Sequence, residues 1–159
     1  VLKLTILTGV RPGVARGCNL EHIDGDVWTV PGEGMKGRKN RTPDFRIPLT
    51  DEARRVIEAA KVFERGGYIF ASERGKNVIT DVGVSKYMRE TRGLKYKVHG
   101  FRSSLRTWAD EQTTAPIEAK AMLLSHKVGT QVEQAYIRTD YLDERRGLLE
   151  QWSKLVAEK

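Results

Sequence analysis

The chain of 159 residues is long enough for one domain with a hydrophobic core and too short for two domains of ordinary size. Its 28 Lys and Arg against 21 Asp and Glu give a formal net charge of +7, which favours a polyanionic partner over an acidic small molecule. The single cysteine, Cys18, excludes an internal disulfide and a cysteine-rich metal site, and no apolar run approaches the roughly 20 residues of a membrane span, so we expect a soluble protein of a reducing compartment.

Two short helices are expected at the amino-terminal end. Leu2, Ile6 and Val10 recur at near-helical spacing, and the pattern resumes over residues 14–20 after an interruption by Pro and Gly. We interpret this pattern as two helices around a bend that carries Arg11. Because the helical pattern already includes the first residue, we expect the chain to be part of a longer protein whose amino-terminal part is absent.

A small β-sheet is expected next. Residues 27–31 and 45–49 have strand patterns, and residues 22–24 are a third candidate. Residues 32–44, between the first two, are rich in Gly, Lys and Arg and too polar for a core. They predict a hairpin with a long basic tip.

The remainder of the chain has mainly helical patterns. Thr50 is a candidate cap for a helix that ends before Gly66, and Thr80 for a second helix that runs to about Arg92. The whole pattern predicts a single α+β domain over residues 1–159, mainly α-helical with a small antiparallel β-sheet. Three apolar stripes at helical spacing should form core or docking surfaces: Phe101, Leu105 and Trp108; Ile117, Ala121 and Leu124; Leu148, Trp152 and Leu155.

The most informative motif is the segment HGFRSSLRTW at residues 99–108. It places His99 and Arg102 three residues apart on a helix, where the two side chains share a face. An imidazole can donate or accept a proton near neutral pH, and a guanidinium fork matches phosphate oxygens. The pair therefore suits chemistry on a phosphodiester.

Further residues of suitable chemistry occur around this motif in a definite order. Arg11 lies upstream in LTGVRPG, and His126 and Tyr136 lie downstream in LLSHK and AYIR. In this order the residues resemble the catalytic domain of the tyrosine recombinase family, especially the integrases of temperate phages and genomic islands. The resemblance runs from about residue 7 to residue 152. It implies that double-stranded DNA is cut and rejoined without ATP through a 3′-phosphotyrosine.

The resemblance and the chemistry together suggest a role for each residue. Tyr136 is the expected nucleophile, and Arg11 and Arg102 are the expected clamp on the phosphate oxygens. His99 and His126 are the expected proton or hydrogen-bond partners of the phosphate. A nucleophile, a clamp and proton donors are what cleavage of a phosphodiester without a metal requires.

Two assignments have competitors nearby. Lys36, in GMKGR at the hairpin tip, stands where the family carries the lysine that protonates the leaving 5′ oxygen, but Lys39 and Arg41 have similar reach. Tyr141 lies close to Tyr136, but acidic residues follow it, and negative charge opposes formation of a phenolate. We prefer Lys36 for its Met-Lys pattern and Tyr136 for its Ala-Tyr-x-Arg pattern.

The sequence departs from the family pattern at two positions. Ser125 stands where the family usually has Gly or Ala, and Val14 stands where members commonly carry an acidic residue that buttresses the site. An apolar residue at position 14 removes a hydrogen-bond acceptor, so we expect reduced or altered activity rather than none. His126 follows an apolar helical segment, and we expect the partial negative charge of a helix end to favour its protonated form.

Double-stranded DNA is the expected partner, and neither a cofactor nor a metal ion is expected. The resemblance implies a tetramer on paired DNA sites in the cytoplasm of a bacterial host, whereas the isolated domain should be a monomer. Residues 142–159 predict a helix that docks on its own domain or on a neighbouring subunit.

Two alternative functions remain: a type IB topoisomerase that relaxes supercoils, and a DNA-binding module with impaired catalysis. Candidate DNA contacts are Lys36, Arg38, Lys39, Arg41, Arg106, Lys127 and Arg138.

Overall fold

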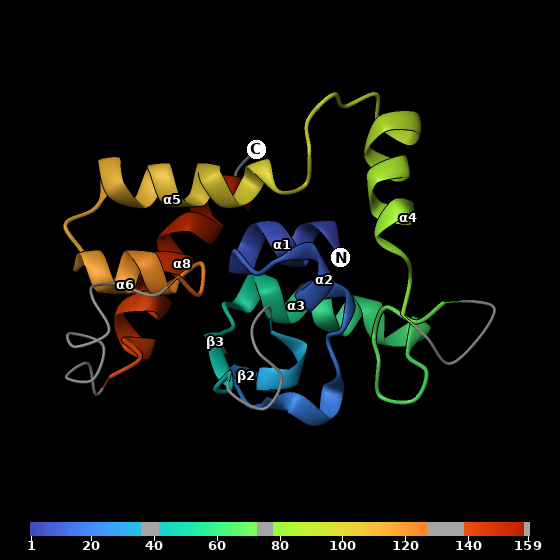
Figure 1. The fold of residues 1–159 in the computed structure, drawn as a ribbon, viewed down its shortest axis with the longest axis horizontal. Helices are drawn as coiled ribbons and strands as arrows, with labels where there is room; N and C mark the ends of the chain where they lie inside the picture. Colours follow the sequence, from blue (N-terminus) through green and yellow to red (C-terminus); the bar gives the residue numbers. More distant parts are fainter. Residues whose placement is uncertain (36–41, 73–77, 127–138, 158–159) are drawn as a thin grey trace.

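The computed structural model describes residues 1–35, 42–72, 78–126 and 139–157 (Figure 1). Its first two helices are α1 (Leu2–Thr8) and α2 (Pro12–Arg16), as the sequence predicts. Gly9 ends α1 in the left-handed conformation with a φ of 68°, and Pro12 occupies the first position of α2. Arg11 directly precedes α2, so the predicted bend that carries it is confirmed.

A three-stranded antiparallel sheet follows, in the order β1 (Ile23–Asp24), β2 (Val27–Val30) and β3 (Phe45–Pro48). The short turns η1 (Leu20–His22) and η2 (Gly32–Gly34) precede β1 and follow β2. Trp28 of β2 pairs with Ile47 of β3, and each is 1% exposed. The three predicted strands are confirmed, and residues 36–41 of the predicted hairpin tip lie outside the described residues.

Helix α3 (Asp51–Ala60) begins after Thr50, whose hydroxyl accepts a hydrogen bond of 3.3 Å from the Ala53 N–H. The 3-10 turn η3 (Lys61–Phe63) extends it. Thr80 caps α4 (Asp81–Lys86) in the same way, and the π-helical turn η4 (Tyr87–Thr91) continues it. Helices α5 (Gly100–Gln112), α6 (Ile117–Met122) and α8 (Leu142–Ala157) make up the rest of the described fold. The mainly helical α+β class is therefore confirmed.

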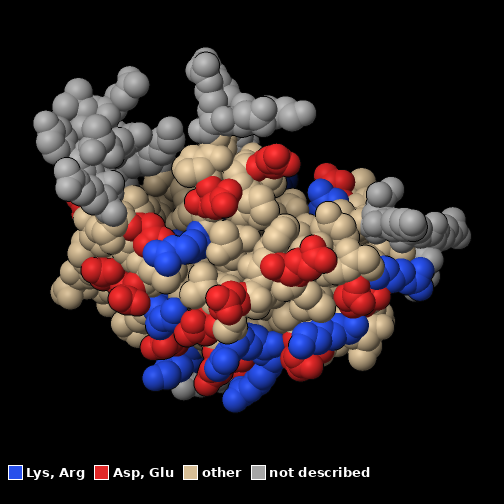
Figure 2. All heavy atoms as spheres, turned by 90° about the horizontal axis from the view of Figure 1, so that it is seen from below, with Lys and Arg blue, Asp and Glu red and all other residues tan. Residues whose placement is uncertain are grey.

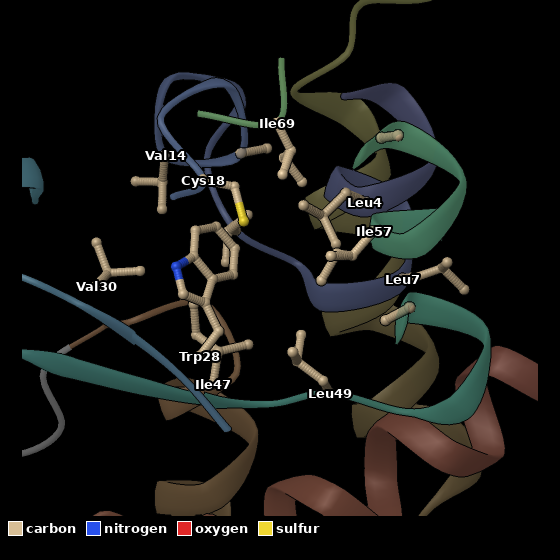
Figure 3. Packing of buried hydrophobic residues seen from close by; sticks show 14 residues of the cluster. Leu4, Leu7, Val14, Cys18, Trp28, Val30, Ile47, Leu49, Ile57 and Ile69 are labelled. Atoms are coloured by element: carbon tan, nitrogen blue, oxygen red, sulfur yellow. The ribbon is translucent and has the colours of Figure 1, made fainter. Parts of the chain in front are cut away.

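The larger hydrophobic cluster lies between α1, α2, the sheet and α3 (Figure 3). Cys18 is fully buried there, and burial raises the pKa of its thiol to about 12, so this cysteine is a core residue. The residues labelled in the figure are Leu4, Leu7, Val14, Cys18, Trp28, Val30, Ile47, Leu49, Ile57 and Ile69.

A second cluster joins α5, α6 and α8, which lie together at the left of Figure 1. Helix α1 connects the two clusters, because it packs against α3 and also against α5 and α8. Two residues of the predicted stripes do not lie in the core: Ile117 is 61% exposed at the start of α6, and Leu155 is 39% exposed. The buried members are Leu105, Ala109, Ala119, Leu123, Leu124, Leu148, Leu149 and Trp152.

Helix α8 packs against α1, α6 and β3 of its own chain. Its Trp152 is 6% exposed, donates from Nε1 to the carbonyl oxygen of Ile6 at 2.8 Å, and has its ring centroid 5.4 Å from that of Trp108. The hydroxyls of Ser153 and Thr50 are 2.9 Å apart and hydrogen-bonded. Leu148, Leu149 and Trp152 of this helix are therefore buried within the same chain, whereas Leu155 is partly exposed.

Truncation of the Trp152 side chain should strongly destabilise the domain. Trp152→Ala removes a buried indole and leaves the Ile6 carbonyl without its donor, so we expect the free energy of unfolding to fall by about 3–5 kcal/mol. Leu155→Ala, on the exposed side of the same helix, should change it by no more than about 0.5 kcal/mol. Urea denaturation of both variants measures the difference, and equal losses would show that α8 is not anchored through Trp152.

Among the residues that the structure describes, no helix is long and apolar enough to cross a lipid bilayer.

Much of the surface charge is paired. Arg54 and Arg55 of α3 bind Asp51 and Glu52 one turn earlier on the same helix. Figure 2 shows a face on which basic and acidic side chains are interspersed. A surface of this kind is a poor match for a polyanion, because its positive charge is locally neutralised.

Candidate active site

The bend between α1 and α2 places Arg11 against the end of α6. Gly9 is required in this bend, because a Cβ there would lie 2.5 Å from Leu105 Cδ2 of α5 and because its φ is positive. Arg11 follows two residues later, half-buried, and donates from Nη1 to Ser125 Oγ at 3.2 Å. The close approach of α1 to α5 therefore brings Arg11 to residues more than a hundred positions away.

Arg102 lies in the first turn of α5 and is 3% exposed. Its Nη1 donates to the carbonyl oxygen of Gly9, and its Nη2 donates to that of Leu124 at 2.9 Å. Arg102 thus ties the α1–α2 bend to the turn after α6, a structural role that the sequence does not indicate. A guanidinium has five N–H groups, so donors for a phosphate remain.

The two arginines form a concentrated positive charge. Burial, and then the charge of Arg11, lowers the pKa of Arg102 to about 10, so it remains charged at neutral pH. Within the described ranges, neither guanidinium is ion-paired with a carboxylate. Two adjacent cations without a carboxylate partner favour an anionic ligand. The N–H groups of the two guanidinium groups suit the oxygens of a phosphate.

The turn after α6 presents three consecutive residues to this pair. The His126 N–H donates to the Ala121 carbonyl at 3.1 Å and the Ser125 N–H donates to the Met122 carbonyl at 3.0 Å, which closes the helix end. The Leu124 carbonyl then binds Arg102, the Ser125 hydroxyl binds Arg11, and His126 follows directly.

His126 lies among positive charges. Partial withdrawal from water, followed by the charges of Arg102, Arg11, Arg106 and His99, lowers its pKa below the usual 6.5. The expectation that a helix end favours the protonated ring is therefore wrong, because the surrounding cations and the loss of solvent outweigh the partial charge of the helix end. His99, exposed at the start of α5, belongs to the same group of charges.

A titration checks this electrostatic account. In the DNA-free protein, NMR of the His126 ring should give a midpoint below pH 6.5, and Arg11→Gln should move it upward by removing a nearby cation. Between that midpoint and pH 6.5, His126 binds more protons in the unfolded chain than in the folded chain. Its contribution to the free energy of unfolding is therefore complete above pH 6.5 and falls as the pH is lowered. A midpoint above 6.5 would contradict the account.

A cavity of about 10 Å³ lies beside the arginine pair, and the chain just before Lys36 reaches it. Its wall includes Val14, which is 7% exposed and whose side chain has no hydrogen-bond acceptor. The position at which the sequence departs from the family pattern therefore faces the site. Met35, the residue before Lys36, is also part of the wall. Met35, in the turn that follows β2, therefore lies beside the two arginines.

The chain after Tyr136 is anchored near the same place. Asp140 accepts hydrogen bonds of 2.9 and 2.8 Å from Arg46 of β3, and a third of 3.3 Å from Arg145. Burial alone would raise the pKa of Asp140, but these bonds and charges outweigh it and lower the pKa. Arg145 is 1% exposed, and its Cζ lies 4.9 Å from the ring centroid of Phe45, which also lines the small cavity.

Of the predicted site residues, the structure brings together Arg11, Arg102, His99 and His126. Arg106 is near them and bonds to Asp110 at 2.7 Å on its own helix. The other predicted residues lie outside the described residues, so their roles stay predictions: Lys36, Arg38, Lys39, Arg41, Lys127, Tyr136 and Arg138. Tyr141, the competing nucleophile, is half-buried and packs against the second cluster.

Sequence reasoning missed two features of the site. The first is the hydrogen bond from Arg11 to Ser125, although the unusual Ser at this position was a signal. The second is the exposed basic segment before α5, where Lys95 and Lys97 flank Tyr96, which is 75% exposed and lies three residues before His99. The run of basic residues RETRGLKYK was the available signal.

Comparison with known proteins gives one family. The model of the phage integrase family matches residues 1–142. Prophage integrase IntA of Escherichia coli (strain K12) is 30% identical over 156 residues, which cover 95% of this chain and 37% of that protein. The integrase of Shigella phage Sf6 is 25% identical over 164 residues, which cover 99% of this chain and 41% of the relative. The chain therefore spans about two fifths of the length of these relatives.

Solved structures with a similar fold are those of lambda integrase. A lambda integrase(75-356) dimer bound to a COC' core site superposes with a TM-score of 0.56 at 21% identity, over 87% of this chain and 50% of that one. A lambda integrase tetramer bound to a Holliday junction gives a TM-score of 0.56 at 22% identity, over 87% of this chain and 41% of that one. At this level of identity the likeness shows a shared fold.

Proposed function

The chain belongs to the phage integrase family, and from this premise we propose that it is the catalytic part of an integrase, a tyrosine-type recombinase that cuts and rejoins double-stranded DNA at specific sites. The observation that carries the proposal is the convergence of Arg11, Arg102 and His126 at the meeting point of α1, α5 and α6. These residues come from three distant segments. The positive charge of the two arginines would bind a phosphodiester.

The proposed cleavage step needs a nucleophile from the chain itself. The Tyr136 hydroxyl gives up its proton, for which a ring nitrogen of His99 or His126 is the proposed acceptor, and its oxygen forms a bond to the scissile phosphorus while the bond from phosphorus to the 5′ oxygen breaks. The 5′ oxygen leaves with the electron pair and takes a proton, for which Lys36 is the proposed donor. The product is a 3′-phosphotyrosine and a free 5′ hydroxyl. Attack by a 5′ hydroxyl on the same phosphorus reverses the step and rejoins a strand without ATP.

The arginine pair would stabilise the transition state. Negative charge grows on the non-bridging oxygens as the tyrosine attacks, and N–H donors held in place before the reaction stabilise it without reorganisation. Arg102 is held rigidly by two backbone carbonyls, which suits this role. His126, with its lowered pKa, is neutral at pH 7 and able to accept as well as donate a hydrogen bond at the phosphate.

The wider assembly is part of the proposal. Lambda integrase was solved as a dimer on a core site and as a tetramer on a Holliday junction, and we extend tetramer formation on paired DNA sites to this protein, with the isolated domain a monomer. We place it on DNA in the cytoplasm of a bacterial host cell. The basic hairpin tip and the segment with Lys95 and Lys97 would contact backbone phosphates.

An exchange assay tests the function. A pool of nicked duplexes with randomised sequence is incubated with the protein, and duplexes that stay attached after denaturation are recovered and sequenced. Two labelled duplexes with the recovered site are then mixed with the protein. A recombinase yields strands joined between the two duplexes. Relaxation of a supercoiled plasmid without joined products would indicate a topoisomerase, and binding without any attached DNA would indicate a binding module.

A further inference from the structure

Ser125 has a backbone conformation that usually belongs to glycine. Its φ is 51°, and the hydrogen bonds from Ser125 N–H and His126 N–H close the end of α6 in the pattern that favours glycine at this position. A side chain at a left-handed position is disfavoured because its Cβ crowds the backbone. The chain therefore carries a serine here against the local conformational preference.

The serine side chain has a specific partner. Arg11 Nη1 donates to Ser125 Oγ at 3.2 Å across a separation of 114 residues. Among the described residues, this hydroxyl is the acceptor for the Arg11 side chain. The side chains of Val14 and Met35, which line the cavity beside Arg11, carry no oxygen.

Arg11 needs an acceptor because its neighbour is a second cation. Arg102 is fixed by the carbonyl oxygens of Gly9 and Leu124, and it shares the wall of the small cavity with Arg11. Like charges repel most strongly when water is partly excluded. A half-buried arginine without an acceptor would be free to turn away from Arg102 toward solvent.

We propose that Ser125 is a positioning residue for Arg11: its hydroxyl holds the Arg11 guanidinium beside Arg102, so that both arginines face the same phosphate. The inference rests on the proposed function. This role explains why the chain has a serine at a position where glycine would remove the backbone strain of a positive φ. Ser125 itself does not need to touch the DNA.

Three variants separate positioning from a purely conformational role. Ser125→Gly relieves the backbone and removes the hydroxyl, Ser125→Ala keeps the backbone strain and removes the hydroxyl, and Ser125→Asn tolerates the left-handed conformation and supplies an acceptor oxygen. We expect the Gly and Ala variants to cleave roughly ten-fold more slowly at saturating DNA with unchanged DNA affinity, as expected for one lost hydrogen bond to a charged group. The Asn variant should cleave faster than both. The Gly variant should melt at a higher temperature than the Ala variant.

A Gly variant that cleaves as fast as the wild-type protein would overturn the proposal, and so would a loss of cleavage that is matched by an equal loss of DNA binding. A second readout does not depend on catalysis. In the DNA-free protein, NMR signals of the Arg11 guanidinium, identified by their loss in Arg11→Lys, should show restricted motion that Ser125→Gly abolishes. If the wild-type protein attaches to no duplex, the proposed function fails, whereas unchanged Arg11 signals in Ser125→Gly would overturn the positioning role alone.

Discussion

The Tyr136→Phe protein will bind DNA as the wild-type protein does but will form no covalent adduct with it. The substitution removes one oxygen atom, so the fold and the cationic surface should be unaffected. Without that oxygen no bond to phosphorus can form, and the loss should be complete rather than partial. A denaturing gel with labelled nicked duplex measures the adduct, and an equilibrium binding assay measures the affinity.

Tyr141→Phe is the matched control. Tyr141 lies five residues further along the chain, and its half-buried ring packs against the second hydrophobic cluster. This variant should form the adduct at the wild-type rate. A Tyr136→Phe protein that still forms a complex resistant to denaturation would show that another residue is the nucleophile, and loss of the adduct in Tyr141→Phe alone would identify that residue.

Replacing Arg11 with alanine should slow cleavage roughly a hundred- to thousand-fold at saturating DNA, the usual effect of removing one transition-state donor. The affinity for DNA should fall far less, because a single contact among many is lost. Arg11 is the cleaner of the two arginines to test, because its side chain is held by one serine hydroxyl. Equal losses in binding and in cleavage would instead indicate an ordinary backbone contact.

Arg102→Ala should differ from Arg11→Ala in a measurable way. Arg102 is 3% exposed and bound to two buried carbonyl oxygens, so its removal should lower the free energy of unfolding by about 2–4 kcal/mol as well as slowing cleavage. Arg11→Ala should leave thermal stability nearly unchanged. Thermal unfolding of the two variants checks this contrast, and equal melting temperatures would show that the Arg102 bonds do not hold the bend to the turn.

Local patterns in the sequence predict most of the secondary structure. The bend at Arg11, the three strands and the cap at Thr50 depend on neighbouring residues, such as Pro12 after Arg11 and the acidic first turn after Thr50. The exposure of Ile117 and Leu155 could not be predicted in this way. A helical stripe indicates which side of a helix is apolar, but the neighbouring elements decide how far along the helix that side is covered.

The candidate site was predictable in its residue types and not in its internal contacts. The order of Arg11, Arg102 and His126 along the chain resembles that of the tyrosine recombinases, and this resemblance predicts phosphodiester chemistry. The bonds of Arg102 to Gly9 and Leu124 arise because α1, α5 and the end of α6 pack together, and no local pattern encodes them. The same packing partly withdraws His126 from water and surrounds it with cations from distant segments, so its pKa is lowered rather than raised as expected from its helix end.

In the proposed function, the chain cleaves DNA through Tyr136, and protein groups alone supply the charge and the protons. The most direct test is to trap the wild-type protein on the recovered nicked duplex in excess EDTA, digest the adduct and locate the modified residue by mass spectrometry. We expect the adduct to form in the chelator, with a nucleotide linked through its 3′-phosphate to the oxygen of Tyr136. An adduct at any other residue, or one that forms only when magnesium is restored, would contradict it.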